Sequence, residues 1–149
     1  MGLPYRQIEI DRACELAGFT SVIEQLPQGF DTLISERGLN LSGGQKQRLA
    51  LARGLLAASD VGLVLLDEAT SSVDASTEAE IYDRVMSAFA RACIVSSVHR
   101  LHLLRRFDIV IVMEEGRVVD SGAPDEVRQR RPDLFAHAAM EVVAETRAA

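Results

Sequence analysis

The stretch Val61-Gly62-Leu63-Val64-Leu65-Leu66-Asp67-Glu68 decides the fold of this chain. Its apolar part, residues 61–66, is too short for a helix of its own and lies between acidic residues, as is typical of a strand buried on both faces. A helical pattern over residues 77–90 follows, and then a second apolar run, residues 93–98. Strand, helix and strand in this order predict a βαβ unit and therefore an α/β fold with parallel strands.

Upstream of this unit the pattern is helical. A short helix is expected over residues 7–17 and ended by Gly18, with a turn region at residues 27–31. A longer helix is expected to begin after Ser42 and to reach Ala58. Ser42 followed three residues later by Gln45 forms a capping box, and apolar residues then recur at helical spacing.

Downstream, residues 109–113 are expected to form a third strand and residues 117–120 its hairpin partner, joined by Glu114-Glu115-Gly116. The chain then closes with an expected helical tail. Its apolar face comprises Leu134, Phe135, Ala138, Ala139, Val142 and Val143.

Composition and charge exclude several classes of protein. The 149 residues are 48% hydrophobic and 26% charged, which is ordinary for one globular unit and excludes long disorder. The net charge of −6 argues against a duplex nucleic-acid binder, which needs a basic face. No apolar run approaches the roughly 20 residues that cross a bilayer, and no signal peptide is visible. Cys14 and Cys93 are interpreted as small buried thiols in a reducing compartment.

The string Leu41-Ser42-Gly43-Gly44-Gln45 is suited to bind an anion. At a helix start, free backbone N–H groups and the positive end of the helix dipole face outward, and Gly43 and Gly44 allow a phosphate to approach the backbone. The alternative is an ordinary N-cap whose glycines only form a turn.

Asp67 and Glu68 stand at the end of the first expected strand, where α/β proteins bind ligands. Because side chains alternate along a strand, one acid can hold hydrated Mg²⁺ while the other faces a water poised for attack. The alternative is a pair of solvated loop residues or the cap of the next helix.

Two further residues are candidates because of their positions. His99 directly follows the second expected strand, so it could share a ligand with Glu68 if the strands are neighbours. A structural histidine is the alternative, and His102 and His137 receive only that interpretation. Asp74, in Ser72-Val73-Asp74, is either a plain helix-start residue or part of a contact loop beside the carboxylates.

Taken together in this order and spacing, residues 41–45, 66–68, 72–74 and His99 resemble the nucleotide-binding domain of ABC transporters. They are similar to its signature motif, Walker B with the catalytic glutamate, D-loop and switch histidine. The resemblance covers nearly the whole chain and implies a partial P-loop NTPase fold. Residues 1–58 would be the helical-subdomain portion, and residues 59–149 would carry Walker B, the D-loop, the switch histidine and a C-terminal hairpin and helices.

The resemblance also implies roles, with ATP and Mg²⁺ as cofactors. Asp67 would help hold Mg²⁺, Glu68 would polarise the attacking water, and His99 would contact the γ-phosphate. The signature residues Ser42, Gly43, Gly44 and Gln45 would close over ATP held by a second nucleotide-binding domain in a head-to-tail dimer, with Asp74 at that interface.

Three other segments resemble those of exporter-type members, whose cassettes contact transmembrane domains. They are Phe30-Asp31-Thr32, Ser35-Glu36-Arg37-Gly38 and the expected hairpin Arg117–Gly122. The resemblance therefore implies transmembrane domains as partners, no nucleic acid, and a location at the cytoplasmic face of a membrane.

One element of the family is absent from this sequence. A Walker A loop needs a lysine between glycine and serine or threonine, and the single lysine, Lys46, lies between Gln45 and Gln47. We expect the C-terminal part of a cassette, either cut from a longer polypeptide or encoded as a truncated gene, that is inactive alone and prone to self-association through a bared sheet edge. Alternatives are a non-catalytic partner that supplies its signature motif in trans, and a soluble ABC protein of repair or translation.

Overall fold

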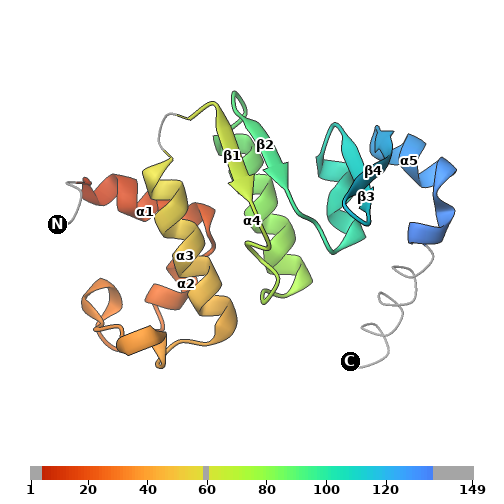
Figure 1. Ribbon diagram of the computed structural model, residues 1–149. Helices are drawn as coiled ribbons and strands as arrows, with labels where there is room; N and C mark the ends of the chain where they lie inside the picture. Colours follow the sequence, from red (N-terminus) through yellow and green to blue (C-terminus); the bar gives the residue numbers. More distant parts are fainter. Residues whose placement is uncertain (1–4, 59–60, 136–149) are drawn as a thin grey trace. The chain divides into compact units, whose positions relative to one another are not determined.

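The computed structural model describes residues 5–58 and 61–135 and divides into two compact units, Met1–Ser97 and Val98–Ala149 (Figure 1). The sequence carries neither a linker nor a change in composition at this boundary. The first unit contains the expected strand, helix and strand, and the second contains the hairpin. The fold class is α/β, as predicted.

The helices of the first unit are α1 (Gln7–Leu16), α2 (Thr20–Ile23), α3 (Gly43–Ala57) and α4 (Ala75–Ala88). The first ends at the expected glycine, because Gly18 adopts a positive φ of 63° that lets the chain turn directly into α2. Helix α1 packs against both α3 and α4. The residues buried among these helices include Ala13, Cys14, Ala17, Phe19, Val22, Ile23, Leu51, Ala52, Leu55, Ile81 and Val85.

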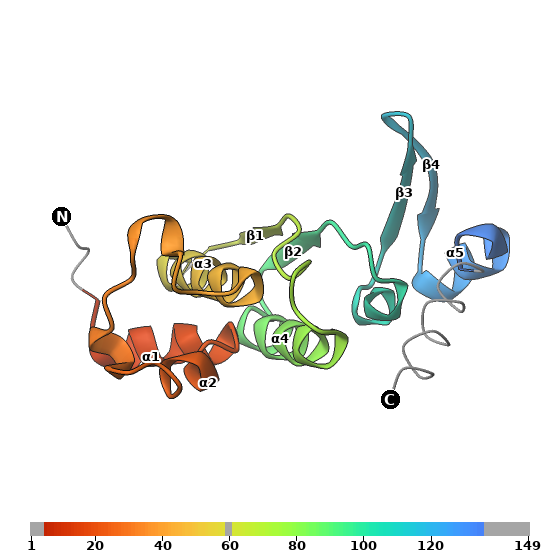
Figure 2. The ribbon, with the colours of Figure 1, turned by 90° about the horizontal axis from the view of Figure 1, so that it is seen from below.

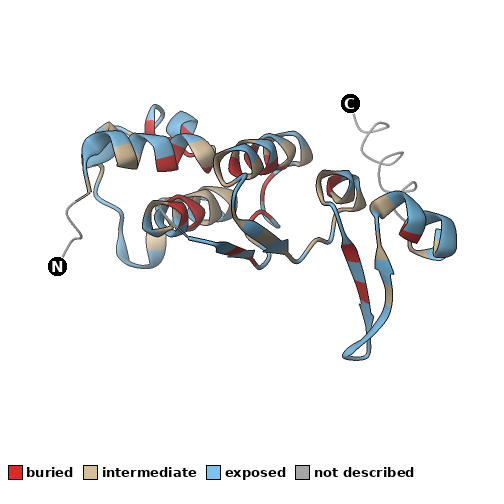
Figure 3. Cartoon of the chain, turned by 90° about the horizontal axis from the view of Figure 1, so that it is seen from above, coloured by how far each residue is buried: buried red, intermediate tan, exposed pale blue. Residues whose placement is uncertain are grey.

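The two strands β1 (Leu63–Leu66) and β2 (Cys93–Ser96) pair in parallel, with Leu63 opposite Cys93 and Leu66 opposite Ser96. The prediction that the first strand is buried on both faces is wrong. Its residues alternate between exposed and buried, because the helices of this unit lie on one face of the β1–β2 ribbon (Figures 2 and 3). No other element among the unit's described residues covers the opposite face.

The second unit contains a 3₁₀ segment, η3 (Leu101–Arg106), the hairpin β3 (Val110–Glu114) and β4 (Arg117–Gly122), and α5 (Pro124–Arg130). The strands are antiparallel, as predicted, with an irregularity between Val112 and Met113. Its small core consists of Val110, Val112 and Val127, with Leu104 and Leu134 packed against it.

The predictions for the C-terminal helix and for the two cysteines have different outcomes. Most of the expected helical tail falls on residues 136–149, outside the described residues. Cys14 is buried as expected, and burial raises the pKa of its thiol. Cys93 is exposed, contrary to expectation, because the first residue of β2 lies on the uncovered part of the ribbon. Among the described residues, no helix is long and apolar enough to cross a membrane.

Candidate functional site

The first turn of α3 contains the predicted anion-binding string. The hydroxyl of Ser42 accepts a hydrogen bond from the Gln45 N–H at 3.3 Å, and the Oε1 atom of Gln45 accepts one from the Ser42 N–H at 2.8 Å. Both halves of the expected capping box are therefore formed. In this arrangement the side chain of Gln45 is engaged in capping its own helix.

The two glycines of this string have a neighbour in the same unit. A Cβ atom at Gly44 would lie 2.6 Å from the backbone oxygen of Ser72, a distance that real Cβ atoms do not show. Gly43 lies beside the Ser72 side chain, at 3.8 Å for the corresponding Cβ position. Close packing between the start of α3 and the loop after β1 thus requires glycine at position 44, whatever ligand this turn binds.

The two predicted acids follow β1 and are both exposed. The Ser97 hydroxyl, just beyond β2, donates to Asp67 Oδ1 at 2.8 Å and accepts from the Glu68 N–H at 3.0 Å. The Ser97 N–H donates to the Leu66 carbonyl at 3.0 Å, which extends the parallel pairing by one residue. The carboxyl ends of the two strands therefore meet, as predicted. Ser97, at the end of β2, is bonded there to the carboxylate of Asp67 and to the backbone of Glu68.

Glu68 has an unusual backbone. Its φ is 47°, in the left-handed region that residues with a Cβ atom adopt rarely. Such a conformation persists when the surrounding structure holds it in place. Besides Ser97 on the N–H side, the Glu68 carbonyl accepts a hydrogen bond from the Gln47 amide of α3 at 3.0 Å.

Asp74 is the N-cap of α4. Its Oδ1 accepts hydrogen bonds from the Ser76 hydroxyl at 2.6 Å and the Thr77 N–H at 2.9 Å. These bonds, that from Ser76 first, hold the pKa of the Asp74 carboxyl far below its usual value. Of the two alternatives left by the sequence, the helix-start role is present in the structure. A contact across an interface stays a prediction.

His99 is exposed and lies in the second unit, in the segment that leads to η3. Asp67 and Glu68 belong to the first unit. The structure thus brings together Ser42, Gly44, Asp67 and Glu68 with the loop that precedes α4, whereas His99 is described only within its own unit. Its contact with a nucleotide stays a prediction.

Sequence reasoning missed Gln47 and Ser97. Ser97 follows Ser96 at the end of the second expected strand, and a pair of hydroxyls there, beside the acids of a parallel neighbour, could have identified it. Gln47 carried no comparable local signal, because its partners lie 21 to 25 residues further along the chain.

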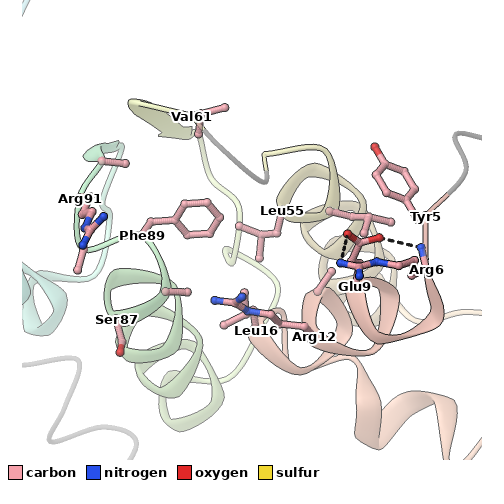
Figure 4. A pocket seen from close by; sticks show the side chains of 15 residues that line it. Tyr5, Arg6, Glu9, Arg12, Leu16, Leu55, Val61, Ser87, Phe89 and Arg91 are labelled. Carbon is pink, nitrogen blue, oxygen red and sulfur yellow. Dashed lines mark hydrogen bonds and ion pairs between the residues drawn. The ribbon is translucent and has the colours of Figure 1, made fainter.

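A cavity of about 520 Å³ lies elsewhere in the first unit, between α1, the end of α3 and the segment after α4 (Figure 4). Arginine side chains from Arg12 and Arg91 and apolar side chains from Leu55 and Phe89 line it. It lies at the amino end of β1, and none of the predicted site residues is among its described lining. The predicted chemistry therefore belongs to the opposite, carboxyl end of the strands, which is the ligand-binding end of α/β sheets.

The residues present are compatible with the expected cation. Mg²⁺ is commonly bound through one or two carboxylates, with water and substrate phosphates completing its shell. Asp67 supplies one exposed carboxylate that a hydroxyl orients. No cluster of three or more metal-ligating side chains occurs in the part of the chain that the structure describes.

Comparison with known proteins supplies the family. Residues 8–71 match the family model described as ABC transporter. The chain is also 38% identical over 135 residues to the heterocyst differentiation ATP-binding protein HepA of Nostoc sp., covering 91% of this chain and 22% of that protein. The chain belongs to the ABC transporter family.

Two further ABC proteins extend the comparison. The ATP-dependent lipid A-core flippase of Pseudomonas aeruginosa is 41% identical over 119 residues, which are 80% of this chain and 19% of the flippase. The solved structure of a bacterial Atm1-family ABC exporter with ATP bound matches with a TM-score of 0.82 at 34% identity, covering 91% of this chain and 24% of that one. The chain thus spans about a quarter or less of the length of these relatives. The match to the exporter structure identifies the fold as part of a P-loop ATPase domain.

Proposed function

We propose that this chain provides the signature motif and the Walker B acids of an ATP-hydrolysing cassette in an exporter-type ABC transporter. The observation that carries the proposal is the junction of Ser97 with Asp67 and Glu68 at the carboxyl end of β1. It presents two adjacent acids at the ligand-binding end of a parallel sheet, with one hydroxyl bonded to the carboxylate of Asp67 and to the backbone N–H of Glu68.

In this proposal the two acids divide the chemistry. Asp67, oriented by the Ser97 hydroxyl, would be the protein ligand of Mg²⁺, which when bound neutralises charge on the phosphate oxygens. Glu68 would accept a proton from the water that attacks the terminal phosphate of ATP. At Glu68 the left-handed backbone interrupts the extended course of β1, which would direct its side chain differently from that of Asp67.

The signature residues would act at a second nucleotide. Ser42, Gly43, Gly44 and Gln45 surround the start of a 15-residue helix, whose first N–H groups and dipole favour a phosphate. A second nucleotide-binding domain, arranged head to tail, would hold that ATP. Asp74 would then contribute to the shared interface, and His99 would contact the γ-phosphate.

Transmembrane domains are the proposed partners of the segment between α2 and α3. Large apolar side chains are exposed along it, including those of Phe30 and Leu33. An apolar groove of about 170 Å³ adjoins it, lined by Phe30 and Ile34 together with residues of α1 and α3. Exposed apolar side chains beside a groove favour a protein partner. Through such domains the chain would lie at the cytoplasmic face of a membrane.

A second candidate is a non-catalytic partner that supplies the signature motif in trans to a complete cassette. The observation that favours it is the lysine count, because the single lysine of the chain lies on α3, between two glutamines. A pull-down with a complete cassette tests it. Capture that requires ATP and is lost when Ser42 is replaced supports the candidate, and capture that is indifferent to ATP contradicts it.

A graft tests the leading proposal. The matched segment of the P. aeruginosa lipid A-core flippase is replaced by this chain, and Mg²⁺-dependent ATP hydrolysis is measured with and without Glu68→Gln. We expect the graft to hydrolyse ATP and Glu68→Gln to lower kcat by roughly a hundredfold or more, because a positioned general base contributes about 10²–10⁴ in rate. Glu80→Gln, on the exposed side of α4, is the matched control and should leave kcat unchanged. An active graft that tolerates Glu68→Gln would contradict the proposal.

A further inference from the structure

Gln47, on the second turn of α3, makes three hydrogen bonds to one distant loop. Its Nε2 donates to the Glu68 carbonyl at 3.0 Å and to the Ser71 hydroxyl at 2.7 Å. Its Oε1 accepts from the Ser72 N–H at 2.7 Å. A primary amide has two N–H donors and one carbonyl acceptor, so both kinds of group are used on the same loop.

The loop that Gln47 holds is the one that positions Glu68. The backbone N–H of Glu68 donates to the Ser97 hydroxyl, and its backbone carbonyl accepts from the Gln47 amide. Two residues that are distant in the sequence therefore hold the backbone of one left-handed residue on both sides. Removing either partner would leave the conformation less constrained. Gln47 is therefore placed to affect where the Glu68 carboxylate points, without touching that carboxylate through these bonds.

The same loop also contacts the first turn of α3. The backbone oxygen of Ser72 occupies the space where a Cβ atom of residue 44 would be, and the Ser72 N–H is bound to Gln47 one turn further along. The start of α3 and the loop from Glu68 to Ser72 are thus joined by both packing and hydrogen bonds.

We propose that Gln47 is a positioning residue that fixes the backbone of Glu68 and couples the signature turn of α3 to the acid at the end of β1. This inference rests on the proposed function, in which the signature turn and Glu68 serve different nucleotides. Gln47 would then link the state of one nucleotide site to the catalytic geometry of the other.

Two substitutions of Gln47 and one control separate this role from a merely stabilising one. Gln47→Leu keeps the approximate volume and removes all three hydrogen bonds, whereas Gln47→Glu keeps an acceptor for the Ser72 N–H and loses the donor to the Glu68 carbonyl. Gln7→Leu removes a glutamine on α1 whose side chain donates to Asp11 on the same helix, and serves as the matched control.

The first readout is hydrogen exchange at the Ser72 amide in the full chain. We expect about fivefold faster exchange in Gln47→Leu than in the wild type, because the Ser72 N–H loses a hydrogen bond of roughly 1 kcal/mol. Gln47→Glu and Gln7→Leu should exchange at nearly the wild-type rate. Unchanged exchange in Gln47→Leu would overturn the inference at its first step.

The second readout is ATP hydrolysis in the flippase graft that carries this chain. Both Gln47 variants should lower kcat by about tenfold while KM for ATP stays within about twofold, since the rate depends on Glu68 geometry more than nucleotide binding does. Equal kcat for Gln47→Glu and Gln7→Leu would overturn the inference. An inactive wild-type graft would instead overturn the proposed function, and the exchange of Ser72 would still report whether Gln47 holds the loop.

Discussion

The two faces of strand β1 are both apolar but have opposite environments. On the face toward the helices, Val64 and Leu66 are 7% and 8% exposed, whereas on the other face Leu63 and Leu65 are 50% and 67% exposed. The hydrogen bonds that hold Asp67 and the backbone of Glu68 come from Ser97, just beyond β2, and from Gln47 of α3. The candidate site thus depends on the packed face, and the open face is available for association.

The largest expected effect comes from a cavity on the packed face. Leu66→Ala should lower the free energy of unfolding by about 2–5 kcal/mol, because it removes a buried side chain from a filled core. Leu65→Ala, its neighbour on the open face, should change that free energy by no more than about 0.5 kcal/mol. Urea unfolding followed by circular dichroism measures both. Equal losses for the two variants would refute the difference between the faces.

A smaller effect is expected at the cap of α4, the helix against the packed face. Asp74→Ala should cost about 1 kcal/mol of stability, the usual loss for an N-cap carboxylate. Its pKa is lowered in the folded state, so this stabilisation is present above the ordinary pKa of 3.8 and is lost as the pH falls below it. Unfolding of the wild type and Asp74→Ala at pH 7 and pH 3 should give a difference that shrinks at the lower pH. A difference that grows on acidification would contradict this assignment.

Substitutions on the open face should have the smallest effect on the free energy of unfolding. They should have the clearest effect on self-association. Leu65 and Val95 are directly opposed in the sheet and both exposed. Leu65→Lys combined with Val95→Glu places opposite charges across the strands, so unfolding should change by less than about 1 kcal/mol while self-association through the apolar face declines. Sedimentation of the two proteins at equal concentration checks this. A wild type that sediments as a single monomer would show that the open face does not drive association.

Local patterns predicted some parts of the fold well. The capping box of Ser42 and Gln45 involves residues three positions apart, so the sequence contains all the information that forms it. The parallel pairing of the strands and the antiparallel hairpin follow from short apolar runs and a Glu-Gly turn. Helix α5 was missed, although Pro124 at its first turn, with Asp125 and Glu126, gave a local start signal.

Other parts could not be predicted because they depend on distant residues. An apolar run such as residues 63–66 indicates a strand, but which of its faces is packed depends on helices that lie elsewhere in the sequence. The bridge from Gln47 to the Glu68–Ser72 loop likewise spans more than 20 residues and leaves no periodic pattern. The acids Asp67 and Glu68 were found because position at a strand end is itself informative, whereas the residues that orient them were not.

We propose that this chain supplies the acids and the signature turn, and that another segment supplies the phosphate-binding loop. The most direct test is Mg²⁺-dependent ATP hydrolysis by the purified chain alone, with Glu68→Gln beside it. We expect no hydrolysis above background in either protein, because the single lysine at position 46 is not part of a Walker A loop. Robust hydrolysis by the wild type that Glu68→Gln abolishes would contradict it.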